Sequence, residues 1–273
     1  MVDLHIHSNH SDGTDSVEEL AEKLKEIGIT VCALTDHDTV DGCDKLAQLL
    51  PERIRFYKGI EFSCVTQFGK CHILGYGVNT SGEYLIKAID AGREKRAKKL
   101  KIRLAYLKET FDIVFPDEEV KALSDMPSVG KPHIAQLMVK QGLASSVQEA
   151  IKTYMSAFPS ETDRLDAKTA VGAILSSNGT PVWAHPLGGE GEKPISEETF
   201  YHQLELLLSY GLKGLECCYS RYNIEQRAFL LDAAKKYHLT VTGGSDYHGA
   251  TKDILPGCLS SDGTEAEQYI TLK

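Results

Sequence analysis

The sequence predicts an α/β fold in which buried, mostly parallel strands alternate with helices in a barrel-like arrangement. Three observations support this prediction. Several strand-like runs, such as residues 29–34, are apolar on both faces, which is typical of parallel strands that helices cover on both sides. Segments with a helical apolar period separate these runs, as in a repeating strand and helix architecture. Finally, metal-binding residue types stand at the ends of several strands, where parallel barrels carry their active sites.

Length and composition indicate a globular protein with one large core or a core plus an inserted subdomain. The 273-residue chain has 42% hydrophobic and 25% charged residues, which is ordinary for this class. The first residues lack the basic and apolar regions of a signal peptide, and no apolar run approaches the length of a membrane span. We therefore expect a cytoplasmic protein without a membrane partner.

The cysteines and the net charge argue against a disulfide framework, a thiolate zinc site and binding to long nucleic acids. The seven cysteines form no C-x-x-C pair and predict reduced, mostly buried thiols, so neither a disulfide framework nor a thiolate zinc site is expected. A formal net charge of −9 disfavours binding to long nucleic acids, which requires a broad basic surface. A small anionic substrate is compatible with this charge if positive residues gather locally, and no obligate protein partner is inferred.

The first predicted strand, residues 2–7, carries two candidate metal ligands. Apolar and polar residues alternate along it, so a β-strand would direct His5 and His7 to the same side. Two neutral imidazoles from one strand can hold an ion such as zinc, manganese or iron. A lone His-x-His pair is a weak signal, so the prediction depends on other ligands joining it.

The next segments continue the alternation up to a hairpin. Residues 17–27 predict a helix that Asp15 or Ser16 caps and Gly28 ends. Strand 29–34 leads into the polar cluster 35–39, and a short helix at 44–50 stops at Pro51. Strand 54–63 carries Glu61 near its end, and residues 62–65 and 71–76 predict a hairpin with His72 at the start of its second arm.

Residues 82–165 predict an α-helical insertion between two barrel segments, 1–81 and 166–273. Strand signals stop there, and helical patterns occupy residues 84–108, 117–123, 132–140 and 147–155. We expect this insertion to act as a cap over the substrate. Its first helix is rich in Lys and Arg, a pattern that is usually just a solvated helix face.

After the insertion the strand and helix alternation resumes. Helices are predicted at 167–175, 197–210 and 223–237, and strands at 181–184, 212–218 and 239–242. The first of these strands ends in His185, the second carries Glu216, and the third leads into the segment that contains Asp246 and His248.

Ligand-type residues are concentrated at strand ends. Those at or near strand ends are His5, His7, His37, Glu61, His72, His185, Asp246 and His248. Because the carboxyl ends of parallel barrel strands form one rim, we expect these side chains to meet in a shared metal site. A random distribution would place most of them on helices and loops.

These motifs resemble those of the PHP (polymerase and histidinol phosphatase) superfamily. The resemblance rests on His5-x-His7 with Asp12, on Glu61 and His72, and on the segments 35–38, 184–186 and 245–248. The order of segments, with a helical insertion after the hairpin, is most similar to the branch of nucleoside 3′,5′-bisphosphate phosphatases and short-RNA exonucleases. The resemblance implies a distorted seven-stranded, TIM-like β/α barrel that binds two or three divalent metal ions.

The resemblance also implies three ligand sets and three catalytic residues. The first set is His5, His7, Glu61 and Asp246, the second is Glu61, His72 and His185, and the third is Asp12, His37 and His248. Glu61, Asp246 and His185 are the expected catalytic residues, and Glu61 is suited to bridge two ions because a carboxylate can share its oxygens. Manganese, zinc or iron is expected, with magnesium as a further candidate at the third site, where Asp12 replaces His and favours a harder ion.

Such a site suits the hydrolysis of phosphoesters. Two cations lower the pKa of a water molecule between them and stabilise the phosphate oxygens that gain charge. The expected substrates are phosphate monoesters or short phosphodiesters of small nucleotides, including nucleoside bisphosphates and short oligoribonucleotides. Candidates for binding the unreactive phosphates are Arg93, Arg96, Lys131, His133 and Arg221. Lys131 stands where the family has Arg, so it keeps the charge but loses bidentate contact.

Other carboxylates near the strand ends predict supporting roles. Glu216 is expected to orient or stabilise its neighbours rather than to bind metal, and Asp36 and Asp38 flank His37 and are expected to orient it or nearby loops. Two alternative functions stay open. Histidinol phosphate or phosphotyrosine hydrolysis would be favoured by an insertion without a nucleobase pocket, and a non-catalytic metal-stabilised domain would show eroded ligands, of which the sequence has none.

Overall fold

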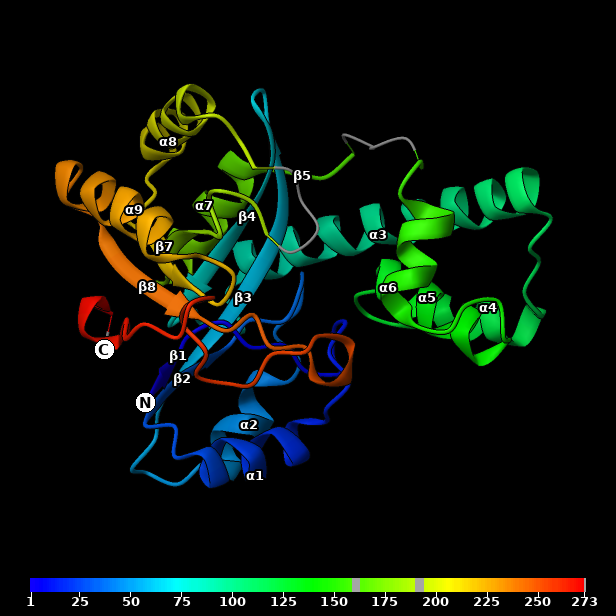
Figure 1. Cartoon of the computed structure of the whole chain (residues 1–273), viewed down its shortest axis with the longest axis horizontal. Coiled ribbons are helices and arrows are strands. Elements are labelled where there is room, and N and C mark those ends of the chain that lie inside the picture. The colour runs from blue at the N-terminus through cyan, green and yellow to red at the C-terminus, as the bar shows by residue number, and fades with distance from the viewer. Residues whose placement is uncertain (159–162, 190–193, 273) are drawn as a thin grey trace.

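The computed structural model describes residues 1–158, 163–189 and 194–272. The sheet follows the order β1-β2-β3-β4-β6-β7-β8, and the short β5 pairs with β3 outside this path. Seven strands therefore follow one another around the barrel (Figure 1), which confirms the predicted fold class. The strands are β1 (Val2–Asp3), β2 (Val31–Leu34), β3 (Arg55–Thr66), β4 (Gly69–Tyr76), β5 (Leu165–Asp166), β6 (Thr180–Ala184), β7 (Gly214–Tyr219) and β8 (Thr240–Gly244).

Backbone hydrogen bonds close the barrel between its first and last strands. The amide of Leu4 donates to the carbonyl of Gly243 over 3.0 Å, and the amide of His7 donates to the carbonyl of Tyr247 over 2.9 Å. Among the described strands of the barrel path, β4 alone runs antiparallel to both neighbours, β3 and β6. The predicted hairpin thus becomes the antiparallel part of an otherwise parallel barrel.

Strand β1 is shorter than the predicted 2–7, since its regular pairing with β2 ends at Asp3. The following residues divide their hydrogen bonds between two loops. Thr35 donates its amide to the carbonyl of Ile6 over 2.8 Å, and Asp246 donates its amide to the carbonyl of His5 over 2.9 Å. The segment that carries both histidines is therefore fixed between the ends of β2 and β8, although it forms no regular ladder.

The helices of the barrel have local signals that explain their bounds. They are α1 (Val17–Ile27), α2 (Cys43–Leu49), α7 (Ala167–Ser176), α8 (Glu197–Tyr210) and α9 (Ile224–Lys236). Ser16 caps α1 in a capping box with Glu19, and Gly28 ends this helix with φ of 84°. Helix α8 has the predicted bounds, with Ser196 as its N-cap and Gly211 as its C-cap.

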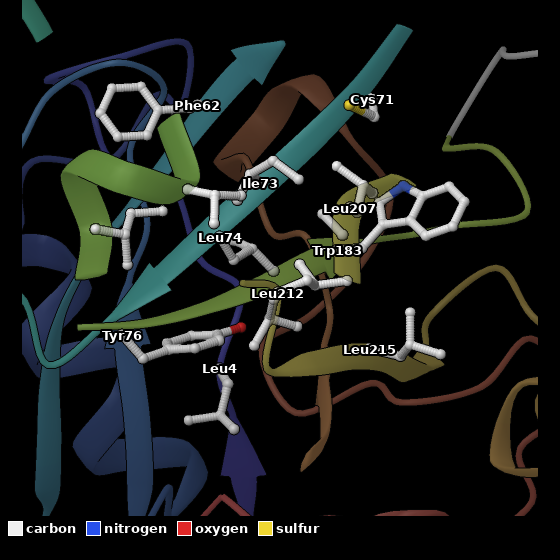
Figure 2. Packing of buried hydrophobic residues seen from close by; sticks show 14 of the residues in the cluster. Leu4, Phe62, Cys71, Ile73, Leu74, Tyr76, Trp183, Leu207, Leu212 and Leu215 are labelled. Atoms are coloured by element: carbon white, nitrogen blue, oxygen red, sulfur yellow. The ribbon is translucent and has the colours of Figure 1, made fainter. Parts of the chain in front are cut away.

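The large hydrophobic core lies between the barrel strands and helices α7, α8 and α9. Figure 2 shows part of it, including Leu4 from the first strand segment, Phe62 from β3 and Tyr76 from β4. Trp183 of β6 stacks on Phe200 of α8 with ring centroids 5.3 Å apart. A second, smaller cluster packs α1 and α2 against the barrel. In the described part of the chain, no helix is long and apolar enough to cross a membrane.

The helical segment between β4 and β5 has a core of its own. It contains α3 (Glu83–Phe111), α4 (Asp117–Ser124), α5 (Lys131–Lys140), α6 (Val147–Ala150) and the π-helix η1 (Ile151–Met155). Leu85, Ala88 and Ile89 of α3 belong to the barrel core, whereas Leu100 and Leu107 belong to the separate core of this segment. Helix α3 therefore spans both parts, and α4, α5 and α6 lie beside its C-terminal half (Figure 1).

Candidate metal centre

One end of the barrel brings nine ligand-type side chains together. They are His5 and His7 after β1, Asp12 in the next loop, His37 after β2, Glu61 in β3, His72 in β4, His185 after β6, and Asp246 and His248 after β8. Eight of them are at most 9% exposed, and the side chain of His72 is 16% exposed. All of them come from the barrel rather than from the helical insertion.

The first ligand set lies at the centre of this cluster. Glu61 Oε2 is 3.2 Å from Nε2 of His5 and 3.2 Å from Nε2 of His7. Asp246 Oδ1 is 3.6 Å and 3.4 Å from the same two nitrogen atoms. One ligand atom from each of the four residues lies within 4.8 Å of the others, close enough for a single metal ion to contact them all.

The second ligand set lies on the other oxygen of Glu61. Its Oε1 is 2.8 Å from Nδ1 of His72 and 3.2 Å from Nε2 of His185. In addition, Nδ1 of His37 lies 3.0 Å from Glu61 Oε2, so His37 borders this set as well as the third one. Each oxygen of Glu61 therefore faces a different group of imidazoles, which is the placement that a bridging carboxylate needs.

The third ligand set contains a single carboxylate. Asp12 Oδ1 lies 3.2 Å from Nε2 of His248, and Asp12 Oδ2 lies 3.9 Å from Nε2 of His37. His7 also approaches this set, with Nδ1 3.9 Å from Asp12 Oδ1. Ser11 Oγ lies 3.4 Å from that nitrogen, so His7 can donate from Nδ1 while its Nε2 faces the first set.

Several buried ligand atoms of the cluster have no hydrogen-bond partner in the described part of the chain, which bears on whether these residues are suited to bind metal ions. Within the described residues, Nε2 of His5, Nε2 of His7, Nδ1 of His37 and Oδ1 of Asp12 have no hydrogen-bond partner. These three nitrogens lie 3.0 to 3.2 Å from Glu61 Oε2 without forming hydrogen bonds to it. Buried polar atoms are nearly always paired, and imidazole and carboxylate groups are the usual ligands of divalent transition metals. The cluster therefore fits metal ions.

Outer partners fix which atom of each ligand faces the centre. Glu216 Oε1 lies 2.8 Å from Nδ1 of His5, and its Oε2 accepts the backbone amide of His185 over 2.7 Å. Tyr219 and Lys252 donate to Oδ2 of Asp246 over 3.0 Å and 2.6 Å. These contacts leave Nε2 of His5 and Oδ1 of Asp246 turned toward the cluster.

Three non-glycine residues at the site have positive φ angles. Positive φ angles occur at Asp38 (51°), His185 (29°) and Asp246 (57°), which are not glycines. Such conformations are costly for L residues and persist where surrounding contacts enforce them. Asp36 accepts from the amide of Ser8 over 2.8 Å, so the aspartates that flank His37 support the loops around it.

Neighbouring imidazoles and Lys252 lower the pKa of the two central carboxyl groups. Burial opposes the ionisation of Glu61, but His37, His5 and His72 outweigh it and hold the pKa of this carboxyl well below its usual value. Burial likewise opposes the ionisation of Asp246, and Lys252 is the main group that lowers the pKa of its carboxyl well below the usual value. Both groups are therefore in the anionic form that binds divalent cations.

Arg93, Arg96 and His133, which were predicted to bind phosphate, contact other protein groups. Arg93 donates to Thr39 and Asp41 over 2.7 Å and 2.6 Å. Arg96 donates from Nε to Asp38 Oδ2 over 2.5 Å and from Nη2 to Ser63 Oγ over 2.8 Å.

Both ring nitrogens of His133 have protein partners, because Nδ1 accepts the amide of Gly130 over 2.9 Å and Nε2 lies 2.8 Å from the carbonyl oxygen of Ser11. A phosphate therefore finds no ring nitrogen of His133 to contact, which argues against the role predicted for it.

Lys131 and Arg221 occupy different places. Lys131 lines a cavity of about 470 Å³ at the edge of the second ligand set, whereas Arg221 is exposed just after β7. We call this space the substrate cavity, and its lining includes Phe68, Lys70, His72, Lys131, Arg164, Trp183 and His185.

Sequence reasoning missed Arg164 as a candidate site residue. Its Nη1 lies 3.0 Å from Nε2 of His72, and it lines the substrate cavity together with Lys131. Arg164 immediately precedes β5, whose pairing with β3 carries it to the site. No local motif marks this position, so only the fold could reveal it.

Several known proteins resemble this chain in sequence and in fold. A family model described as the PHP domain matches residues 3–169. The chain is 30% identical to a 5′-3′ exoribonuclease of Haemophilus influenzae over 90% of this chain and 89% of that protein. It is 29% identical to a phosphoribosyl 1,2-cyclic phosphate 1,2-diphosphodiesterase of Eggerthella lenta over 90% of this chain and 94% of that protein.

Two further relatives agree with these matches. A 3′,5′-nucleoside bisphosphate phosphatase of Chromobacterium violaceum is 26% identical over 94% of this chain and 93% of that protein. A solved structure from Bifidobacterium adolescentis, assigned as a metal-dependent phosphoesterase, is 28% identical with a TM-score of 0.83 and covers 96% of this chain and 93% of its own. The chain belongs to the PHP domain family.

Proposed function

We propose that the chain is a metal-dependent hydrolase that cleaves phosphoesters of small nucleotides. The main observation behind this proposal is that Glu61 lies buried between two groups of imidazoles. Several ligand atoms of this cluster have no hydrogen-bond partner among the described residues. The relatives support it, because their names specify a cyclic phosphate diphosphodiesterase, an exoribonuclease and a nucleoside bisphosphate phosphatase.

We assign two or three ions to the ligand sets described above. Manganese, zinc or iron suits sets that are rich in imidazole, and magnesium is a further candidate beside Asp12. When bound, the ions supply positive charge that lowers the pKa of water and neutralises phosphate oxygens. We further propose a cytoplasmic location, which the free state of the seven cysteines supports.

The protein side chains hold this centre in a reactive arrangement. Glu61, Asp246 and His185 are proposed as catalytic residues because they belong to the first and second ligand sets, where the phosphate would react. Glu216 sets the tautomer of His5 by accepting from its Nδ1, and Tyr219 and Lys252 hold Oδ2 of Asp246 so that Oδ1 faces inward. The protein thus contributes preorganised charge and geometry.

The substrate cavity explains how an acidic protein can bind a small anion. Lys70, Lys131 and Arg164 bring positive charge to the edge formed by His72 and His185. A cavity of about 470 Å³ has the size of a small-molecule site rather than of a channel for long nucleic acids. We therefore propose a small phosphorylated substrate whose reacting phosphate lies at this edge.

A substrate screen tests the proposal directly. Manganese-loaded protein would be assayed for product release from mono- and bisphosphorylated nucleosides and from short oligoribonucleotides. We expect turnover of at least one of these classes. Preference for histidinol phosphate or phosphotyrosine would favour the alternative phosphatase, and inactivity on every substrate despite bound metal would favour a non-catalytic domain.

A further inference from the structure

We propose that Arg96 and His133 of the helical insertion are positioning residues that hold the third ligand set in place. The inference rests on the proposed function, because it concerns the metal ion that Asp12, His37 and His248 would bind. It differs from the phosphate-binding role that the sequence predicted for both residues.

His133 connects the start of α5 to the loop that carries Asp12. Its Nδ1 accepts the amide of Gly130 over 2.9 Å, so Nε2 carries the proton and donates to the carbonyl oxygen of Ser11 over 2.8 Å. Ser11 directly precedes Asp12, and His133 is only 8% exposed. The imidazole therefore acts as a short, buried link with a fixed tautomer.

Arg96 supports the loop of His37 in the same manner. It pairs with Asp38 Oδ2 at 2.5 Å, and Asp38 has the left-handed φ of 51°. Aspartate tolerates this conformation better than most residues, and the ion pair adds a side-chain restraint to the backbone immediately after His37. Arg96 also donates from Nη1 to the carbonyl of Val129 over 3.4 Å, which joins it to the segment that leads into His133.

The insertion backbone lies directly over Asp12. A Cβ atom placed on Gly130 would be 3.7 Å from Asp12 Oδ2 and 3.7 Å from Nη1 of Arg96. The insertion therefore encloses the third ligand set from one side, while β1 and the loop after β8 enclose it from the other.

The third set should depend on such support more than the first. It has one carboxylate, Asp12, whereas the first set has Glu61 and Asp246, and ion affinity rises with the number of charged ligands and with rigidity. Removing an outer partner of a ligand typically weakens metal binding by about 10- to 100-fold. We expect a loss of this size at the third site alone.

Two variants of His133 separate positioning from simple folding. His133→Gln places an amide nitrogen near the position of Nε2 and can still donate to the carbonyl of Ser11. His133→Asn places an acceptor near the position of Nδ1 and keeps the bond from Gly130, but it is too short to reach Ser11. Both variants remove the ring, so a role limited to packing or to capping α5 would not favour Gln.

The test is a manganese titration of metal-free full-length protein that counts bound ions per chain and their affinities. We expect three ions in the wild type and in His133→Gln, and an unchanged pair plus a third ion weakened about 10- to 100-fold in His133→Asn. Arg96→Ala should behave like His133→Asn. Arg103→Ala is the control, because Arg103 lies on the same helix with its guanidinium 5.9 Å from the ring of Phe158.

Each remaining outcome is decisive. Equal affinities for the third ion in Gln, Asn and wild type would overturn the inference, as would a loss of all ions together in the Asn variant. A wild type that binds only two ions would also overturn it, while leaving the proposed function intact. A wild type that binds no ion would contradict the proposed function itself.

Discussion

The barrel and the helical insertion contribute to the metal centre in different ways. The barrel carries all nine ligand-type side chains, seven of them in segments that follow strands and two, Glu61 and His72, within β3 and β4. The insertion instead contacts the loops of Asp12 and His37 from outside. A strand-end ligand is specified by its position along the chain. The role of a Lys or Arg on the insertion depends on which groups the fold brings next to it. Its residue type alone therefore does not reveal whether it binds substrate or another part of the protein.

We expect the largest effect on metal content and turnover from a change in the barrel, at Glu61. Glu61→Gln keeps the shape of the side chain but removes the charge that faces both groups of imidazoles. Metal content and turnover should fall together, and kcat/KM should drop by about 10³-fold or more because the metals supply several kcal/mol of transition-state stabilisation. Elemental analysis and kinetics on the same sample would check this.

Glu109→Gln on the exposed face of α3 is the matched control and should resemble wild type. A Glu61→Gln variant with full metal content and near-native rates would show that Glu61 is not the bridging residue.

We expect a smaller effect on catalysis from Lys131 of the insertion. Lys131 lines the substrate cavity, so Lys131→Ala should remove a contact worth about 1.5 to 3 kcal/mol and lower kcat/KM on a nucleoside bisphosphate by about 10- to 150-fold, mainly through KM. An aryl phosphate without a second phosphate should be affected little. Steady-state kinetics on both substrates would measure the difference.

Arg96→Ala should give another pattern, because its guanidinium holds Asp38 and Ser63. Similar losses on the bisphosphate and on the aryl phosphate are expected for it. If Arg96→Ala instead impaired only the bisphosphate, the original prediction of a phosphate contact would be preferred over the positioning role.

The smallest expected effect concerns the thiols, which report on the barrel alone because the insertion contains no cysteine. Burial raises the pKa of Cys43 to about 12 and that of Cys218 to about 12. A raised pKa keeps these groups protonated, so at pH 8 only about one in 10⁴ of either would be the reactive thiolate.

A thiol reagent at pH 8 should therefore label only the half-buried Cys258 quickly, and the six buried cysteines should react only after unfolding. Rapid labelling of several thiols in the native protein would mean that the barrel opens more readily than its packing suggests.

Most of the barrel could be predicted from the sequence because its signals are local. The predicted N-cap, Asp15 or Ser16, and the terminating Gly28 agree with helix α1, which Ser16 caps, and the alternation around His5 and His7 indicated that both rings share a side. The prediction of one strand over 2–7 was too long, since hydrogen bonds to two different loops replace the ladder after Asp3. The last insertion helix ends at Met155 as predicted, but its second half, Ile151–Met155, is a π-helix rather than an α-helix.

The candidate site was less predictable wherever a residue depends on a distant partner. Nothing near Arg164 in the sequence shows that it meets His72, 92 positions away. His133 looked like a phosphate ligand, whereas its two ring nitrogens are taken by Gly130 and Ser11. Ligand identities follow from residue type and strand position, but contacts between the insertion and the barrel arise only in the folded chain.

The central claim is that this cluster is a metal centre with more than one ion. Elemental analysis of protein purified without chelator tests it most directly. The arrangement of Glu61 between two ligand sets predicts about two or more transition-metal ions per chain. Fewer than one ion per chain, with no increase in metal content and no activity after manganese is added, would contradict the claim.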